Sequence, residues 1–170
     1  MRVVRQAAVV VKMKIAALQP EHFNSVAGIY EEGMATGVAT FETEVPDWTT
    51  WDKKFLPMCR YVMLHEEEVV GWCALSPASK REVYRGVAEV TIYVAASHQR
   101  QGIGKRLLSH LIVESEKAGF WTLQASIFSE NKTSIRLHEQ CGFRLLGYRE
   151  KIAQRDGQWF DKVLLLSKST

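Results

Sequence analysis

The sequence predicts a single α/β domain of the α+β kind with about seven strands, and three observations indicate it. Short runs rich in β-branched residues alternate with segments whose apolar residues recur at helical spacing. Glycine, proline or an Asp-Gly pair stands between most of these segments. The chain has 170 residues, 46% of them hydrophobic, which is enough for one core and short for two domains.

The first half of the chain predicts two helices and a hairpin. Pro20 and Pro46 each stand where a helix can begin, because proline is favoured in the first helical turn. The segment 34–45 has no helical period and predicts a loop. In chain order we expect a strand at Lys14–Leu18, a helix from Pro20 to about Gly33, a helix after Pro46 carrying Trp48, Trp51 and Phe55, and paired strands at Tyr61–His65 and Val69–Leu75.

The second half predicts strands and helices in alternation. Val87–Ala95 is rich in β-branched residues and predicts a central strand with Glu89 inside it. Asp156-Gly157 marks a hairpin turn. The remaining elements are a helix from about Gly102 to Lys117 closed by Gly119, a strand Thr122–Phe128, a helix Lys132–Gln140 closed by Gly142, and strands at about Phe143–Ala153 and Gln158–Leu166.

Charge and cysteine content exclude several classes of protein. The net charge of +3 comes from 22 basic and 19 acidic residues without basic runs, so no nucleic-acid footprint is indicated. The three cysteines predict neither a disulfide framework nor a metal site, which favours a reducing, cytoplasmic setting. No run approaches the ~20 apolar residues of a membrane span. We expect residues 1–12 to be an extension outside the fold, and residues 13–170 to form one domain.

A glycine-containing turn, Gln99–Gly104, lies between the central strand and an amphipathic helix. Backbone N–H groups and the helix dipole can hold an anion at such a place. The turn lacks the third glycine of the dinucleotide fingerprint and the Gly-Lys-Ser/Thr of a P-loop. The glycines alone could equally shape a tight turn flanked by solvated charges.

The turn resembles the signature of the GNAT superfamily of N-acetyltransferases, Gln/Arg-x-x-Gly-x-Gly/Ala, through Gln99, Gly102 and Gly104. The resemblance covers about Met13 to Lys168 and implies a mixed central sheet with helices on both faces. It implies acetyl-CoA as co-substrate, without a metal. The implied coenzyme contacts are Ile92, Tyr93 and Val94 along the pantetheine arm, Gln99, Arg100, Gln101, Gly102, Ile103, Gly104 and Lys105 at the pyrophosphate, and Asn131.

Glu89 is the candidate catalytic carboxylate. A carboxylate in a half-buried strand is costly unless it is hydrogen-bonded, paired or used in chemistry. From the residues alone, an ion pair with Arg85 explains it equally well. The segment 88–94, Ala-Glu-Val-Thr-Ile-Tyr-Val, is similar to a strand of the phosphinothricin and methionine sulfoximine acetyltransferases. That resemblance implies Glu89 as general base for direct attack of an amine on the thioester, acting itself or through a water.

His138 lies on the helix that follows Asn131, and a lone histidine on a helix is usually structural. The same subgroup resembles this chain in having histidine at this spacing. The resemblance therefore implies a catalytic role for His138, either protonation of the leaving thiolate or contact with the substrate.

Two further segments resemble the acceptor-binding parts of this subgroup. Phe41 and Glu42 lie in a loop similar to its Thr-Ala-Thr-Phe-Glu-Thr segment, and a plain surface loop is the alternative. Arg81, Tyr84 and Arg85 match its Arg-x-x-Tyr-Arg segment, where arginines can fork onto a carboxylate or phosphinate. Solvated loop charge explains each of them nearly as well.

The implied acceptor is a small amino-acid-like amine such as phosphinothricin, methionine sulfoximine or methionine sulfone, and members are commonly homodimers. Residues 88 and 90–91 depart from the subgroup's strand, so specificity can differ. Two alternatives stay open. The acceptor can be another amine, such as a polyamine, an aminoglycoside or a protein N-terminus, or the chain can be a regulator that binds acetyl-CoA without turnover.

Overall fold

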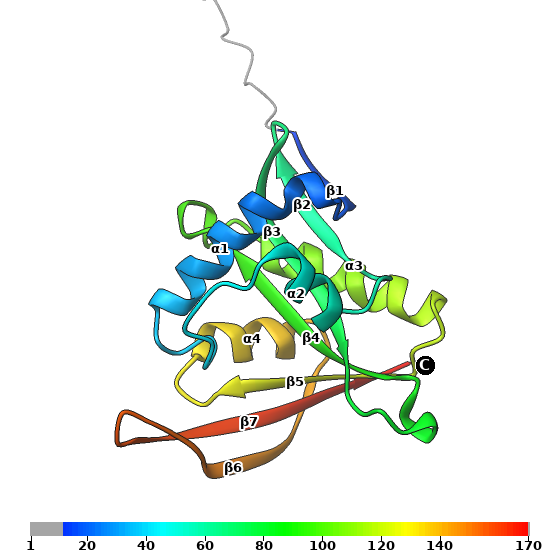
Figure 1. Cartoon of the computed structure of the whole chain (residues 1–170). Coiled ribbons are helices and arrows are strands. Elements are labelled where there is room, and N and C mark those ends of the chain that lie inside the picture. Colours follow the sequence, from blue (N-terminus) through cyan, green and yellow to red (C-terminus); the bar gives the residue numbers. More distant parts are fainter. Residues whose placement is uncertain (1–11, 170) are drawn as a thin grey trace, which may run out of the picture.

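A computed structural model describes residues 12–169, whose strands form a seven-stranded sheet. Figure 1 shows helices flanking this sheet. The expected extension at 1–12 lies outside the described residues except for Lys12. The elements are β1 (Met13–Ala17), η1 (Pro20–His22), α1 (Phe23–Ala35), α2 (Trp48–Lys54), β2 (Tyr61–His65), β3 (Glu68–Pro77), η2 (Glu82–Tyr84), β4 (Val87–Val94), η3 (Ala96–His98), α3 (Ile103–Lys117), β5 (Thr122–Phe128), α4 (Lys132–Gln140), β6 (Arg144–Arg155) and β7 (Gln158–Lys168).

The sheet has the strand order β1-β2-β3-β4-β5-β7-β6. Only the β4/β5 pair is parallel among the described strands, and it joins two strands separated by a helical crossover, as parallel pairing requires. Its register runs from Val87↔Thr122 to Glu89↔Gln124 and stops there, although both strands continue. The two strands therefore separate beyond Glu89, and the predicted mixed sheet is confirmed.

Helices cover both faces of this sheet, as predicted. One buried cluster joins the apolar side of α3, including Leu107 and Leu111, to residues such as Met63 of β2. The other joins α1 and α2 to the opposite face, where Val62 and Leu64 of the same strand point. This alternation follows from the two-residue period of a strand.

The predicted boundaries hold within a few residues, and two differences have local causes. The first turn after Pro20 is a 3₁₀ turn, and the α-helix begins only at Phe23. The second helix ends at Lys54, so Phe55 follows it in an extended conformation instead of being carried by it. Phe55 packs into the buried cluster under α1. Pro57 disfavours a helical conformation at Leu56, the residue before it, so the helix cannot continue through this segment.

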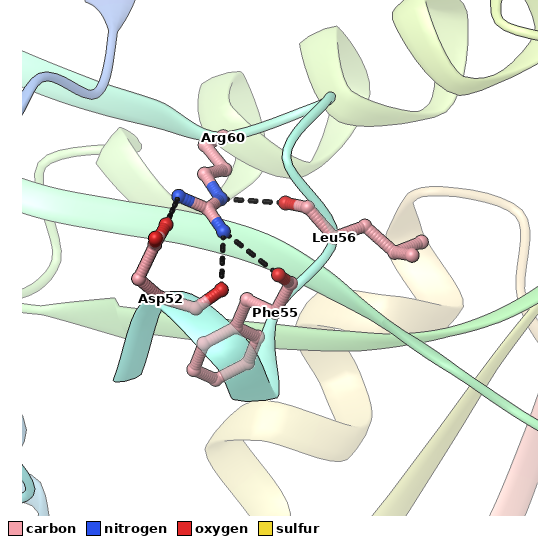
Figure 2. A network of polar contacts seen from close by, with 4 residues as sticks. All are labelled: Asp52, Phe55, Leu56 and Arg60. Carbon is pink, nitrogen blue, oxygen red and sulfur yellow. Dashed lines mark hydrogen bonds and ion pairs between the residues drawn. The ribbon is translucent and has the colours of Figure 1, made fainter. Parts of the chain in front are cut away.

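An arginine closes the end of α2 (Figure 2). The Arg60 side chain donates to the carbonyl oxygens of Asp52, Phe55 and Leu56 at 2.8, 2.7 and 2.5 Å and pairs with the Asp52 carboxylate. The last carbonyls of a helix lack partners inside the helix, and a cation there also faces the negative end of the helix dipole. Arg60 therefore holds the last turn of α2, and with it Lys54, over the sheet.

Candidate active site

A cavity of about 450 Å³ lies where β4 and β5 separate. Glu89 lines it from the last parallel pair, and β4 beyond Glu89 pairs with β3 on one edge only among the described strands. The opposite edge of β4 is therefore open to an extended ligand. The lining residues are Tyr30, Ala39, Thr40, Phe41, Glu42, Lys54, Glu89, Val90, Thr91, Ile92, Tyr93, Ala125, Ser126, Ile127, Asn131, Ser134, His138 and Lys162.

Glu89 has no ion-pair partner within 4 Å among residues 12–169. Arg85, the partner that the sequence left open, instead pairs with Glu82 at 3.7 Å and lies over the Trp121 ring at 5.4 Å. The ion-pair explanation for Glu89 is therefore wrong. Glu89 lines the cavity, and a carboxylate there can accept a proton from a bound molecule.

His138 lines the same cavity but is only 2% exposed. Burial lowers the pKa of its imidazole, against a smaller raising effect of the hydrogen bond to Ser134. A carbonyl oxygen can only accept, so Nδ1–H donates to Ser134 O at 2.7 Å. The neutral ring therefore presents Nε2 as an acceptor. In this state His138 has no Nε2 proton to give to a leaving thiolate.

The loop that carries Phe41 and Glu42 forms one wall of the cavity. The Phe41 ring lies 4.4 Å from the ring of Phe128 in β5. Arg155 at the end of β6 donates to Gly37 O at 2.8 Å and Thr40 O at 3.4 Å, and so fixes the loop from the C-terminal hairpin. Both predicted loop residues thus lie beside Glu89 at the cavity.

The other predicted acceptor residues lie elsewhere. Arg81, Tyr84 and Arg85 are on the connection between β3 and β4, around the turn η2, and none of them lines the cavity. Tyr84 is 45% exposed and has the Arg81 guanidinium over its ring. The structure does not bring these three residues together with Glu89.

A second cavity, of about 620 Å³, lies at the N-terminus of α3. Gly102 is the N-cap in the left-handed region at φ 75° and offers no side-chain cap, so the first N–H groups of the helix face outward without a side-chain partner. The Gln99 side chain donates to Val94 O at 2.8 Å and ties the turn to the end of β4. The lining residues are Val94, His98, Gln99, Arg100, Gly102, Ile103, Gly104, Lys105, Thr133, Arg136, Leu137 and Gln140, so Gln101 is the one turn residue that does not line it.

Several lining residues have no signal in the sequence. Lys162 stands in a C-terminal strand, Lys54 at the end of α2, and Arg136 on α4, directly before Leu137 of the same cavity wall. Only the packing of α4 against α3 brings Arg136 to the turn. The spacing along a single element predicts none of these placements.

A family model described as the acetyltransferase (GNAT) family matches residues 26–143. The chain belongs to this family. The predicted family, fold and enzyme class, an N-acetyltransferase, are thereby confirmed. In this GNAT domain the uncapped N-terminus of α3, its basic neighbours and the open edge of β4 fit a pyrophosphate and a pantetheine arm.

Two relatives lie in the predicted subgroup. The chain is 32% identical to the phosphinothricin N-acetyltransferase of Streptomyces viridochromogenes over 141 residues, 81% of this chain and 77% of that protein. It is 33% identical to the L-methionine sulfoximine/L-methionine sulfone acetyltransferase of Salmonella typhimurium over 106 residues, 61% of this chain. That match spans 62% of the Salmonella protein.

A solved structure supports the same assignment. The phosphinothricin acetyltransferase from Sinorhizobium meliloti, in complex with AcCoA, is 28% identical, with a TM-score of 0.84 over 92% of this chain and 88% of that one. The coenzyme is thus bound in a structural neighbour. No helix within residues 12–169 has the length and apolar character that crossing a membrane would need.

Proposed function

We propose that this protein transfers an acetyl group from acetyl-CoA to the amine of a small amino-acid-like acceptor of the phosphinothricin, methionine sulfoximine or methionine sulfone type. The observation that carries the proposal is the cavity at the β4/β5 separation, where Glu89 and the Phe41 loop converge. The cavity at the N-terminus of α3 begins at Val94, two residues beyond Ile92 on the same strand. The names of the relatives agree with this acceptor class.

In the proposed reaction, the N-terminus of α3 holds the pyrophosphate, and the open edge of β4 holds the pantetheine arm. Glu89 takes a proton from the acceptor's ammonium group, itself or through a water, and so frees the nitrogen lone pair. The amine attacks the thioester carbonyl carbon and the C–N bond forms. The C–S bond then breaks, and the coenzyme A thiolate leaves as the thiol with the second proton of the attacking nitrogen. Backbone N–H groups near Val94 stabilise the negative charge on the carbonyl oxygen. For His138 we propose substrate contact through Nε2, since its buried neutral form offers an acceptor there.

The first test replaces Glu89 by Gln, which keeps the shape of the side chain and removes its basicity. Thiol release from acetyl-CoA is measured with phosphinothricin, methionine sulfoximine, methionine sulfone, spermidine and kanamycin. We expect turnover with the three amino-acid analogues, and kcat/KM lower by roughly 10²- to 10⁴-fold in the variant.

Acetyl-CoA binding, measured by calorimetry, serves as the control because Glu89 lies outside the α3 cavity. A variant that binds acetyl-CoA and turns over at the wild-type rate would contradict the role of Glu89. Binding of acetyl-CoA without turnover of any acceptor would favour the alternative that the protein is a regulator that binds acetyl-CoA without catalysis.

We also propose a homodimer. β6 is an edge strand of the sheet, and the hairpin that it forms with β7 exposes large apolar side chains to solvent. A second copy of the chain is the occupant that we propose for this surface, which we call the hairpin surface and define as Leu145, Leu146, Tyr148, Ile152 and Trp159.

A further inference from the structure

Lys162 of β7 brings a cation into the candidate active site. It pairs with Phe128 in the β5/β7 register, and its Nζ lies 5.1 Å from the Phe128 ring centroid and 5.5 Å from that of Phe41. Its ammonium group thus lies over the faces of two aromatic rings, and Lys162 lines the same cavity as Glu89. No step of the proposed reaction uses this side chain.

The charges that line the cavity leave Lys162 without a carboxylate partner. The two anionic side chains are Glu42 and Glu89, and the two cationic ones are Lys54 and Lys162. Lys54 pairs with Glu42 at 3.4 Å, whereas Lys162 has no carboxylate within 4 Å among residues 12–169.

A half-buried ammonium group without an anionic partner is unfavourable. Burial lowers the pKa of Lys162, Glu89 acts in the opposite direction, and Arg149 lowers it further. An anion bound in the cavity would supply the missing partner and favour the charged form.

An amino-acid acceptor carries such an anion. Its amine must lie at Glu89. Because the carboxylate is attached to the same α-carbon as the amine, the cation that binds the carboxylate must also lie near Glu89. Arg81 and Arg85 do not line the cavity, and Arg85 is already paired with Glu82. We propose that Lys162 binds the carboxylate of the acceptor and thereby selects amino acids over polyamines, whose cationic chain it repels. This inference rests on the proposed function.

The test compares two acceptors that differ only in the carboxylate, methionine sulfone and 3-(methylsulfonyl)propylamine. The variant is Lys162→Met, which keeps the length and apolar stem of the side chain. The loss of one charge-assisted hydrogen bond, about 1.5–3 kcal/mol, corresponds to a roughly 10- to 150-fold fall in kcat/KM for methionine sulfone. For the simple amine we expect a change of less than about 3-fold, because it has no anion for Lys162 to bind. Lys162→Arg should recover part of the loss.

Lys168→Met is the matched control, since it removes the same charge from the same strand at a position outside the cavity. Calorimetric binding of methionine sulfone in the presence of coenzyme A gives a second readout, and Lys162→Met should weaken it. Circular dichroism checks that each variant is folded.

Three outcomes would overturn the inference. If Lys162→Met lowers kcat/KM equally for both acceptors and shifts the acidic limb of its pH profile, Lys162 tunes the basicity of Glu89 and does not bind the acceptor. Unchanged methionine sulfone kinetics in Lys162→Met would overturn the inference and leave the proposed function standing. A wild-type protein that acetylates spermidine and no amino acid would overturn both.

Discussion

At the scale of single residues, His138 shows how one hydrogen bond decides what a side chain can do. Its Nδ1–H is held by the Ser134 carbonyl one turn earlier in α4, and the ring packs edge-on against Phe143 at 5.1 Å. Burial lowers the pKa of the imidazole, so the folded protein resists protonating it. In the unfolded chain the imidazole is exposed to water, so burial does not lower its pKa.

This difference predicts a pH-dependent stability. As the pH falls below about 6.5, the unfolded chain takes up a proton at His138 before the folded protein does, so the free energy of unfolding decreases. At higher pH both states are neutral and the effect is absent. We expect the wild-type Tm to fall more between pH 7.5 and 5.5 than that of His138→Gln, measured by calorimetry. The other four histidines remain in both proteins. An equal fall in Tm for the two proteins would therefore show that His138 does not cause the pH dependence.

At the scale of elements, the turn before α3 depends on one backbone conformation. Gly102 adopts φ 75°, and a Cβ added there would meet no atom within 4 Å. Steric room is therefore available, and only the left-handed conformation opposes a side chain. Gly28 offers a matched position, because it lies inside α1 with equally open space around it and no positive φ.

The same substitution should have opposite effects at these two glycines. Gly102→Ala should lower the free energy of unfolding by about 1–2 kcal/mol, because alanine is strained in the left-handed region. Gly28→Ala should raise it by about 0.5–1 kcal/mol, because alanine favours a helix interior. Urea unfolding measures both, and acetyl-CoA affinity should weaken only in Gly102→Ala. Destabilisation by both variants would show that the backbone argument is wrong.

At the scale of the whole molecule, the C-terminal hairpin has two roles. Lys162 of β7 lines the candidate active site, and Arg155 of β6 holds the Phe41 loop that forms one of its walls. The outer strand of the hairpin, β6, leaves an edge of the sheet open and carries most of the hairpin surface. An exposed edge with large apolar side chains favours association with another chain.

The proposed homodimer predicts a particle of about twice the 19.3 kDa of one chain, measured by light scattering after size exclusion. Leu145, which is 56% exposed, should tolerate Glu in a folded monomer, so Leu145→Glu should halve the mass. Val113→Glu is the control, because Val113 is similarly exposed at 50% but lies on α3. A wild-type mass of one chain would refute the dimer.

The sequence predicts the elements of this fold better than it predicts the candidate site. The seven strands and the left-handed Gly102 leave local signals, because periodicity and turn chemistry act over a few neighbouring residues. The match to a subgroup strand also located Glu89. Lys162 and Arg155 leave no such signal. Lys162 reaches the cavity only through the pairing of β7 with β5, and Arg155 reaches the Phe41 loop only through the packing of the hairpin against that loop. A local sequence pattern likewise cannot predict that Arg81 and Arg85 lie away from the cavity.

The hydrogen bond from Arg155 to Gly37 spans 118 residues of sequence and has a consequence for synthesis. A ribosome releases the glycine turn and β4 well before it releases β7, whereas the acceptor wall needs residues from both ends of the chain. Contacts between distant residues form late because the intervening loop must first be closed. A nascent chain should therefore assemble the coenzyme side of the site first, and gain a place for the acceptor only once its last strand has left the ribosome.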